Sequence, residues 1–448
     1  MGFKDKVAKT GKRSWVWGCG VVALLVVGGL AAAAVLSYVD YPVVALRSGK
    51  VVQEYRATGM PWVAEDVFPD VPAEDNASPE FLAMASSGKP WMSDETRRIQ
   101  IAMSKYDYAT AKKELAGIED QLAEFEAASR VKTLYFEKDW DMNSHVRIPE
   151  FAVFKSAVRT LGYRAEVRAS DGDLEGALSD LRTGWRLGHL IGNQPTNIGL
   201  LVGIACEAII FRASLDVAGV RQNDEAWIAR VRKEIDGWDQ KFEATIPRSG
   251  DIYMRIALAR NLTSRYAFIT SGDDWGDSDS REDGDLVRNG IGAGAVRQAY
   301  LTRFLESSIG VKRIADAYPG KPYRAGLEID QFLKKEFYGM NLSDPYIELT
   351  QSNYAQLGAA IEKSWVMPEL NSAILRAGEV RAKTGSWPTT WEELGVEPVI
   401  DPLTEMPAVI SIRKNQFVIS LKKPSDEVLS NQNLDFLFPT TRRAPIEK

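Results

Sequence analysis

Residues 15–36 read WVWGCGVVALLVVGGLAAAAVL, a run of twenty-two residues without a charge, an amide or a proline. A helix of about 20 apolar residues covers the hydrocarbon core of a bilayer. The run therefore predicts a transmembrane helix over residues 15–37. We expect the lipid bilayer to be a partner of this chain and the residues that follow to build a body tethered to it.

The charges on either side of the run orient it. Residues 1–14 carry five Lys or Arg residues and one acid, whereas residues 37–56 carry three bases and two acids. Positively charged flanks stay in the cytoplasm, so we expect the N-terminus inside and the body outside the cytoplasmic membrane. A cleaved signal peptide is the alternative, because Ala31–Ala34 follow the apolar core. The run is longer than the roughly 7–15 apolar residues of a signal peptide, which favours a retained, single-pass anchor.

The composition of the chain argues against several classes of protein. Its 448 residues include 61 acids and 55 bases, a balance that does not suit a nucleic-acid surface. The two cysteines, Cys19 and Cys206, stand in apolar stretches, so no disulfide framework is available. The two histidines, His145 and His189, are too few for a histidine-rich metal site and argue against a triad. We expect no cofactor and no metal, and no catalytic residue can be identified.

The chain divides into segments of different composition. They are a cytoplasmic basic tail (1–14), the transmembrane helix (15–37), a Pro-rich tether (38–94), a helical body (95–383) with an exposed acidic loop (271–294), and a small α+β unit with a tail (384–448). The fold class is mainly α, with an irregular helical bundle or a stack of helical hairpins as the body. Within the tether, residues 43–55 fit either a strand or a short helix.

Apolar residues spaced by three and four mark the helices of the body. The clearest pattern predicts one helix over residues 95–130, whose stripe packs against a partner helix in the same chain or in another. The members of this stripe are Tyr108, Ala111, Leu115, Ile118, Leu122 and Phe125. A helical hairpin follows from Pro149, with a break at Ser170–Asp173 and an end at Gly192 and Asn193. Further helices are expected over residues 228–242, 252–268, 295–314, 325–337 and 343–382.

Residues 198–211, IGLLVGIACEAIIF, are apolar on nearly every side. A second membrane span is the alternative, but the run is short and contains Glu207. A central acid costs about 3 kcal/mol, against about 0.5 kcal/mol gained by each large aliphatic residue. We therefore expect a buried core helix, with Thr196 and Asn197 at its N-terminal cap.

Glu207 is the strongest single candidate for chemistry. A carboxyl buried in this run would have a raised pKa and could transfer protons, with His189 of the preceding helix near it. The favoured interpretation is structural: Glu207 turns to water or pairs with a base such as Arg212, and His189 caps the end of its helix.

Two other stretches resemble ligand-binding motifs, but the spacing of their residues does not match. Four acids suggest a calcium loop, namely Asp277, Asp279, Asp283 and Asp285. An EF-hand would need a ligand at Arg281 and a glycine at Glu282, so we expect a solvated acidic segment. The glycines at 290, 292 and 294 form a GxGxG without a preceding strand, which favours a hinge over a nucleotide site.

From Thr384 the sequence changes from helical periodicity to short β-branched runs. Val409–Ile412 and Phe417–Leu421 flank Lys414 and Asn415, which predicts a β-hairpin. Residues 434–448 are expected to form a loosely held tail.

Three stretches carry a family likeness: NASPEFLA after the tether, YRAEVRASDGDLEGALSDLRTGWRLGHLIGNQPTNIGLLVGIA in the body, and KTGSWPTTWEELG with DPLTEMP near the end. The chain resembles a large group of uncharacterised bacterial proteins with one N-terminal membrane anchor, a helical body and a small C-terminal unit. That unit is also similar to the C-terminal region of type II secretion pseudopilins, with Gly385, Pro388, Asp401, Pro402 and Pro407 in matching places. The late calcium loop of pseudopilins has no counterpart in LKKPSDE, so the resemblance implies neither filament assembly nor a catalytic residue.

Together these patterns predict an extracytoplasmic interaction or scaffolding protein of the bacterial cell envelope, held by one anchor and working with a protein partner. The alternative is an envelope hydrolase that acts on a glycan or peptide through buried carboxylates, because glycoside hydrolysis needs only two carboxyl groups and some aromatic residues. The identity of the partner and the oligomeric state are open at this point.

Overall fold

A computed structural model describes most of the body of the chain. The described residues are 47, 49–63, 66–67, 71–77, 94–134, 150–238, 241–243, 248–253, 293–337, 353–421 and 435–437. The transmembrane helix predicted over 15–37 lies outside them. So do the acidic loop up to residue 292, with its four aspartates, and the predicted helix 252–268 beyond residue 253.

The chain clusters into two compact units. The first comprises residues 1–62, 141–144 and 254–309, and the second comprises residues 63–140, 145–253 and 310–448. In the first unit residues 49–57 are helical, so the segment that fitted a strand or a helix forms a helix. Its last turn is held by Tyr55, whose hydroxyl donates to the carbonyl of Pro61 at 2.9 Å.

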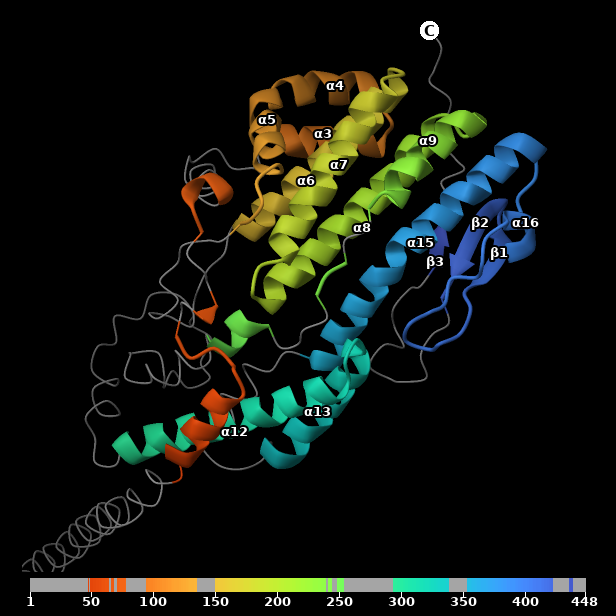
Figure 1. The fold of residues 1–448 in the computed structure, drawn as a ribbon. Helices are drawn as coiled ribbons and strands as arrows, with labels where there is room; N and C mark the ends of the chain where they lie inside the picture. Colours follow the sequence, from red (N-terminus) through yellow and green to blue (C-terminus); the bar gives the residue numbers. More distant parts are fainter. Residues whose placement is uncertain are drawn as a thin grey trace, which may run out of the picture. The chain divides into compact units, whose positions relative to one another are not determined.

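The second unit is mainly helical, with a small antiparallel sheet near its C-terminal end (Figure 1). Its elements are η2 Ala73–Asp75, α3 Asp94–Ser104, α4 Tyr108–Ala116, α5 Glu119–Ala128, α6 Glu150–Ser170, α7 Leu174–Gly192, α8 Asn197–Val220, α9 Glu225–Asp236, α13 Pro322–Phe337, α15 Tyr354–Thr384, α16 Trp391–Leu394, β1 Val409–Arg413, β2 Gln416–Ser420 and β3 Asp435–Leu437. Helix α12, Ala293–Ala317, begins in the first unit and ends in the second.

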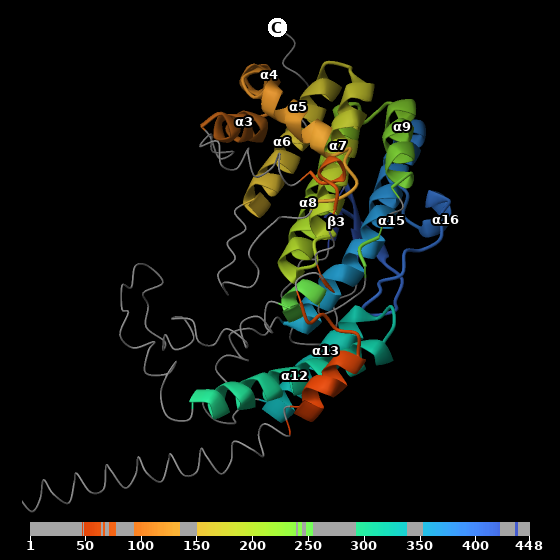
Figure 2. The same ribbon diagram turned by 60° about the vertical axis from the view of Figure 1, so that its left-hand side comes forward.

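Helices α6, α7, α8, α9 and α15 run alongside one another, and α3, α4 and α5 pack across α6 and α7 (Figure 1, Figure 2). One apolar core runs through this arrangement from Ile99 on α3 to Phe417 on β2. The apolar stripe from Tyr108 to Phe125, which was predicted to pack against another helix, packs into this core. Its partner helices therefore belong to the same chain.

The single helix predicted over 95–130 is wrong, because the chain forms three helices there. The first break falls at Tyr106, whose φ of 56° is left-handed, and at Asp107, whose carboxylate accepts from the backbone N–H of Thr110 at 3.1 Å and caps α4. The second falls at Gly117 and Ile118 between α4 and α5. The apolar spacing continues through both breaks, and periodicity alone therefore did not reveal them.

The predicted hairpin α6–α7 and the helix after it are confirmed. Asp173 caps α7 by accepting from the N–H of Gly176 at 2.9 Å, and Gly172 turns the chain with a φ of 87°. Thr196 caps α8 by accepting from the N–H of Gly199 at 3.1 Å. Helix α8 runs to Val220, past the predicted end at residue 211, and its last turns are buried through Leu215, Val217 and Ala218.

Helices α13 and α15 cross closely and cap each other. A Cβ at Gly326 of α13 would lie 2.2 Å from the carbonyl oxygen of Tyr354, so the contact requires glycine. The carboxylate of Asp330 on α13 accepts from the N–H groups of Tyr354 and Ala355 at the start of α15. In return, Glu362 on α15 accepts from the first turn of α13.

The predicted hairpin near the C-terminus is confirmed as β1 and β2. Lys414 and Asn415 both have positive φ, as a two-residue hairpin turn requires. The expectation of a loose tail over 434–448 is wrong at its start, because residues 435–437 form β3 and pair antiparallel with β2. Three residues are too few to show an alternation of polar and apolar side chains, so periodicity could not predict this strand.

Candidate functional site

The sequence pointed to Glu207 and His189, and the structure brings these two side chains together between α7 and α8. His189 Nε2 lies 2.7 Å from Glu207 Oε1, and both side chains are buried. The interpretation that Glu207 faces water or pairs with Arg212 is therefore wrong. Arg212 instead lies 3.6 Å from Asp216, one helical turn further on.

Glycines place the pair by letting the two helices approach closely. A Cβ at Gly203 of α8 would lie 2.4 Å from the Cα of Gly192 on α7, and a Cβ at Gly188 would lie 3.1 Å from the Cβ of Cys206. At this separation a long side chain on one helix reaches the other directly. The close approach therefore explains why His189 meets Glu207.

Aromatic rings enclose the imidazole of His189. Phe242 stacks on it with ring centroids 4.6 Å apart, and Trp185 lies 4.7 Å away at a tilt of 60°. Trp185 stacks in turn on Trp238 at 5.4 Å. Both side chains of the pair are buried, and these rings cover the imidazole.

Burial governs the electrostatics of the pair. It raises the pKa of Glu207, and the hydrogen-bonding and charge contributions of His189 oppose that rise. The 2.7 Å separation of His189 Nε2 and Glu207 Oε1 makes His189 the close polar neighbour of this buried carboxyl. The pair is a buried polar contact that connects α7 to α8.

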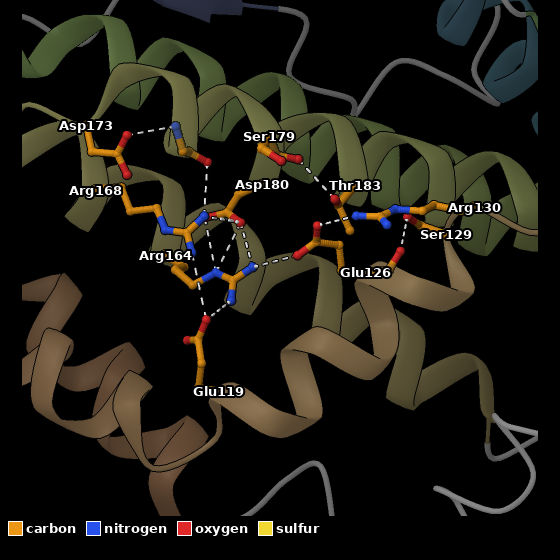
Figure 3. Close-up of polar contacts among 11 residues, drawn as sticks. Glu119, Glu126, Ser129, Arg130, Arg164, Arg168, Asp173, Ser179, Asp180 and Thr183 are labelled. Atoms are coloured by element: carbon orange, nitrogen blue, oxygen red, sulfur yellow. Dashed lines mark hydrogen bonds and ion pairs between the residues drawn. The ribbon is translucent and has the colours of Figure 1, made fainter.

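A second buried cluster, which sequence reasoning missed, joins α5, α6 and α7 (Figure 3). The guanidinium of Arg164 lies against the carboxylate of Asp180, with Nη2–Oδ1 2.6 Å and Nε–Oδ2 3.1 Å. Arg168 adds a contact of 3.0 Å to Oδ1 of Asp180, and Glu119 accepts from Arg164 at 2.7 Å. Arg164 and Asp180 are buried, whereas Glu119 is exposed at the rim.

Burial is the largest influence on Asp180 and raises its pKa to about 6, although the two arginines act in the opposite direction. A sequence signal for the pair existed. Arg164 follows Leu161 by three residues, and Asp180 follows Ala177 by three, so each charge stands at the edge of an apolar helix face. The pattern does not show that the two edges meet.

A third ion pair joins α9 to α15. Arg232 Nε lies 2.6 Å from Oε1 of the buried Glu379, and Arg376 Nη1 lies 2.6 Å from its Oε2. Both oxygens of this carboxylate are therefore occupied. The arrangement fixes two helices and presents no reactive group.

Among the described residues no group of three or more His, Cys, Asp or Glu side chains is placed to hold a metal ion. The four aspartates considered for calcium lie outside those residues. No family model matches the chain, and neither a curated protein nor a solved structure does.

Proposed function

We propose that this chain is a single-pass protein of the cytoplasmic membrane, with its N-terminus inside and its helical body outside, where it serves as an interaction or scaffolding module of the cell envelope. The observation that carries the proposal is the uncharged run of residues 15–36 behind a basic tail. The buried charges of the body support a structural role, because Arg164 with Asp180, His189 with Glu207, and Arg232 with Glu379 each connect two helices.

Cell fractionation tests the anchor. The full-length chain, produced in bacteria with a C-terminal tag, should stay in the membrane pellet after washing with alkaline carbonate and enter solution only with detergent. Recovery in a high-speed supernatant without detergent would overturn the proposal. Removal of residues 1–37 during export, read from the mass of the mature chain, would also overturn the single-pass anchor.

Protease accessibility tests the orientation. Protease added to intact spheroplasts should degrade the body, because the positively charged tail holds the N-terminus in the cytoplasm. A body that is cut only after the spheroplasts are lysed would place it inside the cell. Cross-linking in the membrane followed by affinity purification would then identify the envelope partner that the proposal requires.

The hydrolase alternative rests on the raised pKa values of Asp180 and Glu207. The two belong to separate pairs, and Asp180 is occupied by two arginines. Hydrolysis of cell-wall glycan or peptide by the purified protein, abolished by Glu207→Gln while the helical circular dichroism is retained, would favour the alternative. Equal turnover by the wild type and this variant would exclude Glu207 as its acid.

A further inference from the structure

One face of helix α8 exposes apolar side chains to solvent. Ile198 and Leu201, one turn apart, are 54% and 43% exposed. The same face continues with residues that are exposed or half-buried and equally uncharged, namely Val202, Ala205, Ala208 and Ile209. A surface helix normally turns charged or polar residues to water, so an apolar outward face indicates a contact with something else.

Cations border this face. Lys155 and Arg159 precede Gly162 of α6 by about two turns and one turn, on the same side of the helix. An added Cβ at Gly162 would lie 3.0 Å from the Cβ of Ala213 on α8, so this side of α6 faces α8. Lys155 is exposed and Arg159 half-buried. Arg212 lies at the C-terminal end of the apolar face and is exposed as well.

The combination of an apolar helix face with flanking Lys and Arg residues suits the surface of an anionic bilayer, where apolar side chains enter the headgroup boundary and cations meet lipid phosphates. A second copy of the chain suits it less well, because it would bring the same cations into the contact. The acids at the two ends of the face already have partners, since Asp216 lies beside Arg212 and Asp251 accepts from the backbone N–H of Asn197. The bilayer is therefore the occupant that the charges favour.

The helix lies on the surface rather than spanning it. By length and composition α8 is the one helix among the described residues that could cross a membrane, but just over half of its most apolar stretch is buried in the body. Its inner face packs against α6, α7 and α15. Only the outward face is available to lipid.

We propose that the outward face of α8, together with Lys155, Arg159 and Arg212, docks the body on the anionic surface of a bilayer. The inference deepens the proposed function, on which it rests, by assigning lipid headgroups as the partner of this face. The anchor would keep the body close to the membrane, so that even weak docking is sustained by a high local concentration.

A fluorescent label tests the docking in the full-length protein. Cys19→Ser and Cys206→Ala leave an introduced cysteine as the only thiol. Ala208→Cys on the outward face of α8 and Ala226→Cys on α9 replace two exposed alanines and form a matched pair. Each variant is labelled with an environment-sensitive dye and reconstituted in vesicles of phosphatidylcholine and phosphatidylglycerol that contain doxyl-lipid quencher.

We expect several-fold stronger quenching at position 208 than at position 226, increasing with the fraction of phosphatidylglycerol. Lys155→Gln with Arg159→Gln should lower the ratio of docked to free protein by about an order of magnitude, because each cation near an anionic surface contributes severalfold to binding. Equal quenching at the two labelled positions would overturn the proposal. A disulfide between two copies of the unlabelled Ala208→Cys variant would also overturn it and identify a second copy as the occupant.

Flotation of the same vesicles separates this inference from the proposed function. If the protein floats after carbonate washing but the dye at 208 is not quenched, the docking fails and the anchor stands. If the dye is quenched but carbonate removes the protein, the docking stands and the anchor fails. A protein that does not float even with anionic vesicles at low salt overturns both.

Discussion

At the scale of the residue, buried charges determine which helices meet. Arg164 with Asp180 joins α6 to α7, and His189 with Glu207 joins α7 to α8. Taking charges out of water is costly, and a partner left alone in the interior costs more than the pair does. Such pairs therefore specify an arrangement rather than supply large net stability.

Replacing Arg164 by Met removes the main counterion of Asp180 while keeping an apolar side chain. We expect the free energy of unfolding to fall by about 3 kcal/mol at pH 8, because Asp180 stays buried with Arg168 as its remaining close cation. The loss should be smaller at pH 5, where Asp180, with its pKa raised further, is protonated. Urea denaturation followed by circular dichroism measures both values.

Arg130 supplies the matched control for this substitution. It lies in the same region (Figure 3) and pairs with Glu126 at 2.7 Å, but its side chain is 67% exposed. Arg130→Met should change the free energy of unfolding by no more than about 0.5 kcal/mol. If the two arginine variants lose similar free energies of unfolding, burial of the pair with Asp180 does not increase the cost of removing its arginine.

Asp180 also predicts a pH dependence of stability. Its pKa of about 6 lies above that of an unfolded Asp, so the folded chain holds a proton that the unfolded chain has lost between about pH 4 and pH 6. The stability from this group is fully present below that window and is lost as pH rises through it. Asp180→Asn does not titrate, so the stability of the variant minus that of the wild type should increase across the window, by at most about 1.4 kcal/mol per pH unit. A constant difference from pH 4 to pH 7 would contradict the raised pKa.

At the scale of the element, caps and close approaches decide where helices end and how near they lie. The sequence predicted the cap at Thr196 and the break at Ser170–Asp173, where Asp173 caps α7. It did not reveal Asp107, because the apolar spacing of the stripe continues past it. The sequence allowed His189 to lie near Glu207 but favoured a different partner, because the contact depends on glycines of two helices lying opposite each other.

Gly203→Ala tests the close approach of α7 and α8. The added Cβ would meet backbone atoms, the Cα of Gly192 at 2.4 Å and the carbonyl oxygen of Gly188 at 2.8 Å, which cannot rotate away. We expect a loss of about 2 to 3 kcal/mol in the free energy of unfolding. Gly49→Ala is the control, because a Cβ there has nothing within 4 Å and alanine favours helix. A Gly203→Ala variant as stable as the wild type would mean that the helices lie further apart.

At the scale of the whole molecule, the mainly helical class and the late hairpin follow from periodicity, whereas the sharing of one core does not. Trp387, which follows the C-terminal end of α15, stacks on Phe417 of β2 with ring centroids 5.8 Å apart, and its indole N–H donates to the carbonyl of Asn415 at 3.1 Å. Phe417 and Ile419 belong to the same core as the helices. The composition of the sequence changes at Thr384, but residues on both sides of this position pack into one apolar core.

This continuity predicts that the C-terminal sheet and the helices of the second unit unfold together. Phe417→Ala should lower the free energy of unfolding by about 4 kcal/mol, because it opens a cavity in the shared core. The helical circular dichroism signal and the tryptophan fluorescence should then shift to the same lower urea midpoint. Val409→Ala, at a side chain 59% exposed on the neighbouring strand, should change stability by no more than about 0.5 kcal/mol. If Phe417→Ala shifts only the fluorescence and leaves the helical transition in place, the sheet is an independent unit attached to the helices.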